Sequence, residues 1–182
     1  MKSAIRLIVY CGLFLVGIDS AFSDDTLKNR GNDPFFRISN ALAECPVPLG
    51  PLITEQQWLG ESHYRVERGN SCWIEGRCRL SNAYNYDEEI AVAVQRRLTS
   101  IAAATRWKDQ TSLWLVLQRR FIYLQGCVSP DFDKKTFLFE LGKTADVDQV
   151  VDQTMVGVPN TKIPPAVPYP VAPDAPDGRP PR

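Results

Sequence analysis

The sequence is poor in histidine, the commonest base of hydrolases, and has no apolar run long enough to cross a membrane. It has one histidine, His63, and no GxSxG motif, so a hydrolase triad has little to be built from. It also has no CxxC pair, which argues against zinc when histidine is so scarce. We therefore expect no catalytic residue, no metal site and no cofactor.

Carboxylate pairs are present, but only as neighbours along the chain. A glycosidase needs two carboxylates that face each other across a bond. Glu88 with Glu89, and Asp131 with Asp133, stand where helices are expected to start, and a helix N-terminus favours acidic residues for electrostatic reasons. A hydrolase that acts on the cell wall is therefore kept only as the alternative function.

Neither sign of charge dominates the chain. Lys plus Arg and Asp plus Glu each number 21, and removal of residues 1–23 would leave a net charge of about −1. Nucleic-acid binding needs a dense basic surface, and purely electrostatic adhesion to anionic lipid needs a basic cluster. The composition therefore excludes nucleic acid as an expected partner.

The N-terminus has the features of a secretory signal peptide. Lys2 and Arg6 precede an apolar run over 7–18, which is about half the length of a membrane span. Small residues at positions 21 and 23 predict cleavage after Ser23, so that residues 1–23 are removed. An uncleaved membrane anchor is the alternative. We expect a periplasmic protein that is associated with the envelope.

Four cysteines follow the signal: Cys45, Cys72, Cys78 and Cys127. An even number of cysteines in an exported chain predicts two disulfide bonds. Cys72 and Cys78 lie in a segment that we interpret as extended, where about 20 Å would separate them, so a bond between them is not expected. The two other pairings remain open, and we prefer Cys45–Cys72 with Cys78–Cys127.

Two matching phrases, 63–76 and 113–126, indicate a repeated structural unit. Each phrase ends in glycine and predicts two short strands, joined by a tight turn and followed by a helix. We expect hairpins over about 63–80 and 112–128, with the first turn at Gly69. A sheet formed by repeated hairpins, with helices packed on it, belongs to the α+β class.

The clearest helical pattern covers about 86–104. Asn85 is a candidate N-cap, and Glu88 three residues later completes a capping box. An apolar stripe at helical spacing predicts the face that packs on the sheet; its residues are Ile90, Val94, Leu98 and Ile101.

Three further elements complete the prediction. Asp33 before a proline predicts a helix over about 34–45, a second helix is expected over 132–143, and a last strand over 147–156. Apolar residues on both faces of 113–117 indicate a central strand that is covered on both sides.

The chain changes in composition at its C-terminal end. Nine of the 24 residues in 159–182 are proline, which predicts a disordered tail that acts as a spacer or as a ligand for a partner groove. We thus divide the mature chain into a cysteine-containing N-terminal unit (34–85), a domain (86–158) and the tail.

The order expected for 86–157 is helix, strand, strand, helix, strand. The segments that carry the pattern are Tyr86 to Ile90, then Phe121-Ile122-Tyr123-Leu124-Gln125-Gly126-Cys127-Val128, then Val147 to Val158. This stretch resembles the BON domain of bacterial periplasmic and envelope proteins. The resemblance implies an envelope module with possible lipid binding. One departure is that Arg119-Arg120 stands where the family usually has an Asp-Gly-like turn.

A weaker similarity concerns the block from Cys45 to Arg79, which resembles uncharacterised envelope proteins of type VI secretion. Together these features predict a non-catalytic envelope binding module, with an envelope protein or a phospholipid or peptidoglycan surface as partner. It could serve as an accessory factor of a secretion apparatus or, alternatively, as an osmotic-stress structural protein. Candidate contact residues are Arg119, Arg120 and Trp114, because paired arginines on an exposed turn bind phosphates and carboxylates.

Overall fold

The computed structural model describes residues 26–157 and 166–173, so the predicted signal at 1–23 lies outside the described residues. The elements in chain order are strand β1 (Phe35–Arg37), helix α1 (Glu55–Ile74), the 3-10 helix η1 (Ala83–Tyr86), helices α2 (Asp87–Thr105) and α3 (Trp107–Gln110), strands β2 (Thr111–Gln118) and β3 (Phe121–Val128), helix α4 (Lys134–Gly142) and strand β4 (Gln149–Val156). The α+β class is confirmed.

The strands form one mixed sheet in the order β1-β2-β3-β4. β1 and β3 are antiparallel to β2, whereas β4 runs parallel to β3. A parallel pair needs a crossover, and α4 provides it between β3 and β4. The predicted hairpin over 112–128 and the last strand over 147–156 are both confirmed. β2 is a buried inner strand, as its two apolar faces predicted.

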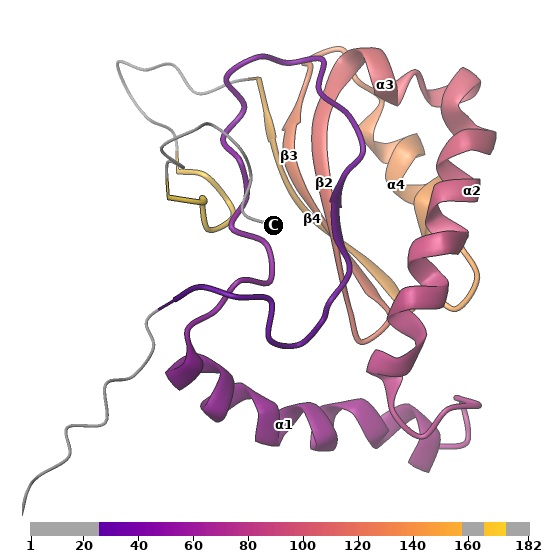
Figure 1. Ribbon diagram of the computed structural model, residues 1–182. Helices are drawn as coiled ribbons and strands as arrows, with labels where there is room; N and C mark the ends of the chain where they lie inside the picture. Colours follow the sequence, from indigo (N-terminus) through magenta and orange to yellow (C-terminus); the bar gives the residue numbers. More distant parts are fainter. Residues whose placement is uncertain (1–25, 158–165, 174–182) are drawn as a thin grey trace, which may run out of the picture.

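Helices α2, α3 and α4 cover one face of the sheet (Figure 1). The predicted stripe of α2, Ile90, Val94, Leu98 and Ile101, is buried there. It packs with the β2 leucines and with residues of β3 and α4, a set that includes Leu113, Leu115, Leu117, Ile122, Leu124, Phe137 and Leu141. This core anchors the helix whose first turn borders the polar pocket described below.

Irregular segments that contain no helix cover the other face of the sheet (Figure 1). A disulfide between Cys45 and Cys127 fastens this layer to β3. The C-terminal residues 166–173 belong to the same layer: Val171 pairs with Pro48, and the buried Tyr169 donates a 2.9 Å hydrogen bond to the carbonyl of Pro46. The prediction of a disordered tail is therefore wrong for 166–173, while 158–165 and 174–182 lie outside the described residues.

The predicted first hairpin is wrong, because most of 63–80 lies in α1. Thr54 caps this helix and forms a capping box with Gln57. Gly69 is not a turn residue: it sits where α1 passes so close to Asn82 that a Cβ would lie 2.2 Å from the side-chain oxygen of that asparagine. Since 113–126 is a strand pair, the two matching phrases do not share a shape, and the inferred repeat is also wrong.

The preferred disulfide pairing is wrong for the same reason. The bonds join Cys45 to Cys127 and Cys72 to Cys78. Because α1 ends at residue 74, the chain turns back through Gly76, whose φ is 71°, instead of extending. The backbone N–H of Cys78 then reaches the carbonyl of Cys72 at 3.1 Å, which places the two sulfur atoms within bonding distance.

The helix predicted over 34–45 is replaced by β1. Asp33 does not cap a helix; its carboxylate instead accepts hydrogen bonds from Arg65 and Gln118. The carbonyl of Pro34 accepts a bond from Leu117, which starts the pairing of β1 with β2. These tertiary contacts of Asp33 outweigh the preference of aspartate for the N-cap of a helix.

The helix ends also differ in detail from the prediction. Asn82 caps η1 by accepting a bond from Tyr84, and α2 follows without a side-chain cap, so the predicted cap at Asn85 is wrong. The predicted helix over 132–143 is confirmed as α4, which Asp133 caps by accepting a bond from Thr136.

Candidate functional site

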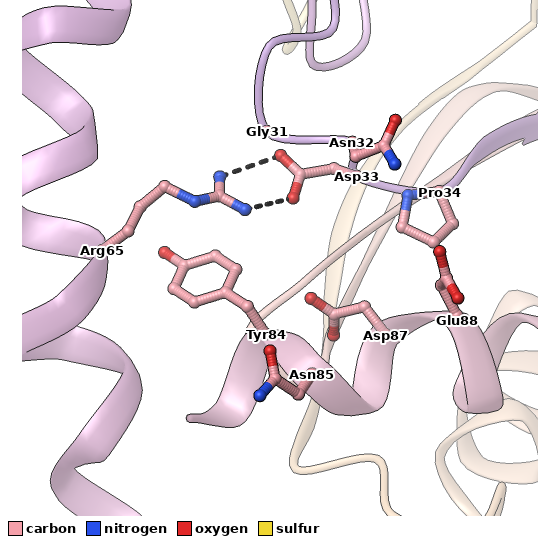
Figure 2. A pocket seen from close by; sticks show the side chains of 9 residues that line it. All are labelled: Gly31, Asn32, Asp33, Pro34, Arg65, Tyr84, Asn85, Asp87 and Glu88. Atoms are coloured by element: carbon pink, nitrogen blue, oxygen red, sulfur yellow. Dashed lines mark hydrogen bonds and ion pairs between the residues drawn. The ribbon is translucent and has the colours of Figure 1, made fainter. Parts of the chain in front are cut away.

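A polar pocket of about 390 Å³ lies between α1, the start of α2 and the segment before β1 (Figure 2). Its lining consists of Gly31, Asn32, Asp33, Pro34, Arg65, Tyr84, Asn85, Asp87 and Glu88. The volume is in the range of small-molecule sites, but the walls are charged rather than apolar. The chemistry of the pocket therefore depends on its three carboxylates, those of Asp33, Asp87 and Glu88.

The first carboxylate is held by a buried ion pair. Arg65 of α1 reaches across to Asp33 with two nearly parallel contacts of 2.5 and 3.0 Å, drawn as dashed lines in Figure 2. Gln118 donates a third bond of 2.6 Å to the same carboxylate. The guanidinium also stacks 3.8 Å above the ring of Tyr84. Asp33 is fully paired, so it holds α1 in place and is not free to act as a base.

The second carboxylate, Asp87, binds the tip of the β2–β3 hairpin. It accepts backbone hydrogen bonds of 2.8 and 2.7 Å from Arg119 and Arg120. Both arginines have positive φ, at 55° and 69°, which costs non-glycine residues energy. Asp87 thus stabilises a turn in which two non-glycine residues have a left-handed backbone conformation. Burial raises the pKa of Asp87 to about 6, and the nearby Asp33 adds to the rise.

The raised pKa of Asp87 predicts a specific pH dependence of stability. Because the folded pKa of about 6 exceeds the unfolded value of 3.8, the folded state binds more protons between them, so the free energy of unfolding falls as the pH rises through this window. Relative to Asp87→Asn, the wild type should lose up to about 3 kcal/mol between pH 4 and pH 7. Urea unfolding of both proteins across this range measures the loss. The matched control is Glu88→Gln, at an exposed position of the same pocket. If the difference in the free energy of unfolding between wild type and Asp87→Asn does not change with pH, the raised pKa of Asp87 is contradicted.

The predicted contact residues are only partly available for a partner. Trp114 is buried, with 4% of its surface exposed, and cannot form a surface contact. Arg120 is engaged within the protein: its guanidinium donates to the carbonyl of Asp146 and to Cys78, and it lies 5.4 Å from the ring centre of Tyr86. Arg119 stacks 4.8 Å from the centre of the neighbouring Phe121 ring and lines a small pocket of about 170 Å³.

The remaining candidates for chemistry stay apart. His63 is exposed on α1, and its ring lies 3.7 Å from Glu67. Within residues 26–157 and 166–173, no group of three or more histidines, cysteines or carboxylates could hold a metal ion. The same residues include no helix with the length and apolar composition of a membrane span.

A feature that the sequence reading missed is an apolar surface on the outer side of α1. We define the α1 stripe as Leu59, Val66, Trp73 and Ile74, whose exposed fractions are 67%, 63%, 52% and 67%. The first three are seven residues apart, so they align along the helix. The signal that could have revealed it is Thr54-x-x-Gln57, the capping box that marks the start of α1.

Comparison of the chain with protein-family models, curated proteins and solved structures finds no match. The geometry of the surface and of the pocket is therefore the basis for the function proposed below.

Proposed function

We propose that this chain is a non-catalytic binding module of the bacterial envelope that contacts a protein partner through the α1 stripe. The observation that carries the proposal is the exposure of four large apolar side chains on one helix of a small protein. Several large apolar side chains exposed along one helix are typical of an interaction site. Trp73, at the C-terminal end of the stripe, belongs to the residue type that contributes most to binding hot spots.

The spacing of the α1 stripe favours a helix as the partner element. Leu59, Val66 and Trp73 repeat every seven residues, which is the period that a second helix follows when two helices pack along a seam. Helical periodicity places the uncharged polar residues Ser62, His63 and Asn70 between them, so the apolar contacts would occur once every two turns. The occupant that we propose is an amphipathic helix of another protein, with its own apolar seam.

The charges of α1 argue against lipid as the occupant. Helices that lie on anionic membranes carry lysine or arginine beside the apolar face. α1 has no lysine, and its two arginines point elsewhere: Arg65 binds Asp33 in the pocket, and Arg68 pairs with Glu61. A protein partner therefore accounts for the apolar stripe better than a bilayer does.

Export, the BON-like identity of 86–157 and a role beside a type VI secretion apparatus are part of the same proposal. Two disulfide bonds support an oxidising compartment. The order α2, β2, β3, α4, β4 supports the BON resemblance. The cell-wall hydrolase gains no support from the pocket, because Asp33 is paired with Arg65 and Asp87 is bound to the hairpin tip.

Substitution of Val66 by aspartate should abolish partner capture. A charge at the middle of the stripe would be buried without a partner, which should weaken binding at least tenfold. Immobilised protein is incubated with periplasmic extract, and each captured protein is quantified by mass spectrometry in parallel with the variant. The matched control is Phe139→Asp, because Phe139 of α4 is exposed to 65%, close to the 63% of Val66, but lies outside the stripe.

Three outcomes distinguish the possible occupants. A protein lost with Val66→Asp and retained with Phe139→Asp supports the proposal. Equal capture by wild type and Val66→Asp contradicts it. Binding of the wild type, but not of Val66→Asp, to phosphatidylglycerol vesicles without any captured protein would also overturn it, since it would assign the stripe to lipid.

A further inference from the structure

The disulfide between Cys72 and Cys78 lies in surroundings that differ from those of the other disulfide. Cys72 is in the last turn of α1, and Cys78 is half-buried in the connection to η1. The guanidinium of Arg120 donates to the sulfur of Cys78 at 2.9 Å. A cation in contact with a sulfur atom stabilises the thiolate that forms when the bond opens.

The sequence adds further positive charge around Cys78. Its two neighbours in the chain are Arg77 and Arg79, which pair with Glu75 and Glu89 respectively. Arg79 also lies 4.9 Å from the ring centre of Tyr86, the same ring over which Arg120 is placed. Arg77 and Arg79 are each paired with a glutamate, so Arg120 is the cation that directly contacts this sulfur.

The Cys45–Cys127 bond differs in its surroundings, since among the described residues no cation is within hydrogen-bond distance of either sulfur. Cys127 is completely buried in β3, and Cys45 contacts the hydroxyl of Tyr169, at 3.9 Å, and the carbonyl of Ser112, at 3.7 Å. Neither group would stabilise a thiolate as a cation does, and burial in apolar surroundings opposes the charge. Of the two disulfides, this one is suited to a structural role.

We propose that Cys72–Cys78 is a redox-active disulfide that an external dithiol reduces reversibly, with Arg120 holding Cys78 as the thiolate. In the net reaction the dithiol loses two electrons and two protons and becomes a disulfide. The Cys72–Cys78 bond breaks, Cys72 takes up one proton as a thiol, Cys78 remains a thiolate, and one proton passes to solvent. Stabilisation of the reduced form makes the bond easier to reduce.

Reduction would act on α1, which ends at this bond. The disulfide closes the turn in which the backbone N–H groups of Arg77 and Cys78 both bond to the carbonyl of Cys72. Opening it removes the covalent link between the last turn of α1 and the chain that leads to η1. The inference does not depend on the function proposed for the α1 stripe, because it concerns the sulfur chemistry alone.

The test is a redox titration that reports on all four cysteines. The folded, oxidised protein is equilibrated in buffers of graded reduced-to-oxidised dithiothreitol ratio, alkylated and mapped by mass spectrometry. Cys72–Cys78 should be half reduced at a ratio at least tenfold lower than Cys45–Cys127. If both bonds open together, or Cys45–Cys127 opens first, the proposal is wrong, and this outcome requires no variant.

Arg120→Gln tests the role of the guanidinium, with Arg119→Gln as the matched control. Arg119 is its neighbour on the same turn but stacks on Phe121 instead of contacting a sulfur. Arg120→Gln should raise the midpoint ratio at least threefold and shift the alkylation of reduced Cys78 to higher pH. Arg119→Gln should change neither, and Arg120→Lys should recover part of the effect. Equal behaviour of Arg120→Gln and wild type would overturn the assignment.

Discussion

Replacement of Gly126 by alanine should lower the free energy of unfolding by about 4 kcal/mol or prevent folding altogether. Gly126 lies in β3 with φ at 126°, a conformation that side-chain-bearing residues rarely adopt. A Cβ there would lie 2.1 Å from the carbonyl oxygen of Ser112 in the neighbouring strand, so the β2–β3 pairing would have to open. Strain and overpacking therefore act together.

Gly157→Ala separates these two contributions to the effect of Gly126→Ala. Gly157 also has positive φ, at 77°, but a Cβ there meets no atom of the described residues within 4 Å. It should cost only the backbone strain, about 1–2 kcal/mol. Urea unfolding followed by tryptophan fluorescence measures both variants, because Trp107 and Trp114 are buried. Equal losses for the two variants would show that the close approach to Ser112 does not matter.

Removal of the Cys45–Cys127 bond should have an effect of similar size. The bond spans 82 residues, and the chain-entropy relation gives about 4–5 kcal/mol for a loop of this length. It also fastens the layer that covers the second face of the sheet. The double replacement by serine should therefore expose that face as well as destabilise the fold.

The same replacement at Cys72 and Cys78 is the comparison for loop length. This bond spans only 6 residues, so its removal should cost about 2 kcal/mol. Urea unfolding of the oxidised wild type and of both double variants gives the two losses. A loss at Cys72 and Cys78 as large as that at Cys45 and Cys127 would contradict the entropic account.

The second half of the chain could be predicted because its signals are local. The α2 stripe repeats at helical spacing, and the leucines of β2 alternate with other apolar residues, so both elements follow from sequence periodicity. Asp133 caps α4 as a standard N-cap. In each of these segments, the pattern of apolar residues fits only one type of secondary structure.

The structure of the first half could not be predicted, because contacts between residues that are far apart in the sequence determine it. Asp33 resembles an N-cap but is held by Arg65, 32 positions away. Gly69-Asn70 resembles a hairpin turn, yet this glycine gives α1 room beside Asn82. The disulfide pairing failed with it, since the distance from Cys72 to Cys78 follows from whether the segment is a helix that turns back or a strand.

The candidate site was the least predictable part. The paired arginines of the hairpin tip were noticed in the sequence, but nothing there reveals that Asp87 binds their backbone. Val66, Trp73 and Ile74 of the α1 stripe lie in the segment for which a hairpin is predicted, whereas the capping box of Thr54 and Gln57 favours a helix there. A surface patch depends on the correct element type, since one period places its residues together and another scatters them.

The contacts that hold α1 to the rest of the protein differ in kind from those of the core. Only Gly69 and Cys72 of this helix are buried, and the contact at its centre is the Arg65–Asp33 ion pair with the ring of Tyr84. Because both partners of this ion pair are buried, dissolved salt screens it little. The attachment of α1 therefore depends on Arg65 and Asp33 both being present, since loss of either one would leave the other charge buried and unpaired.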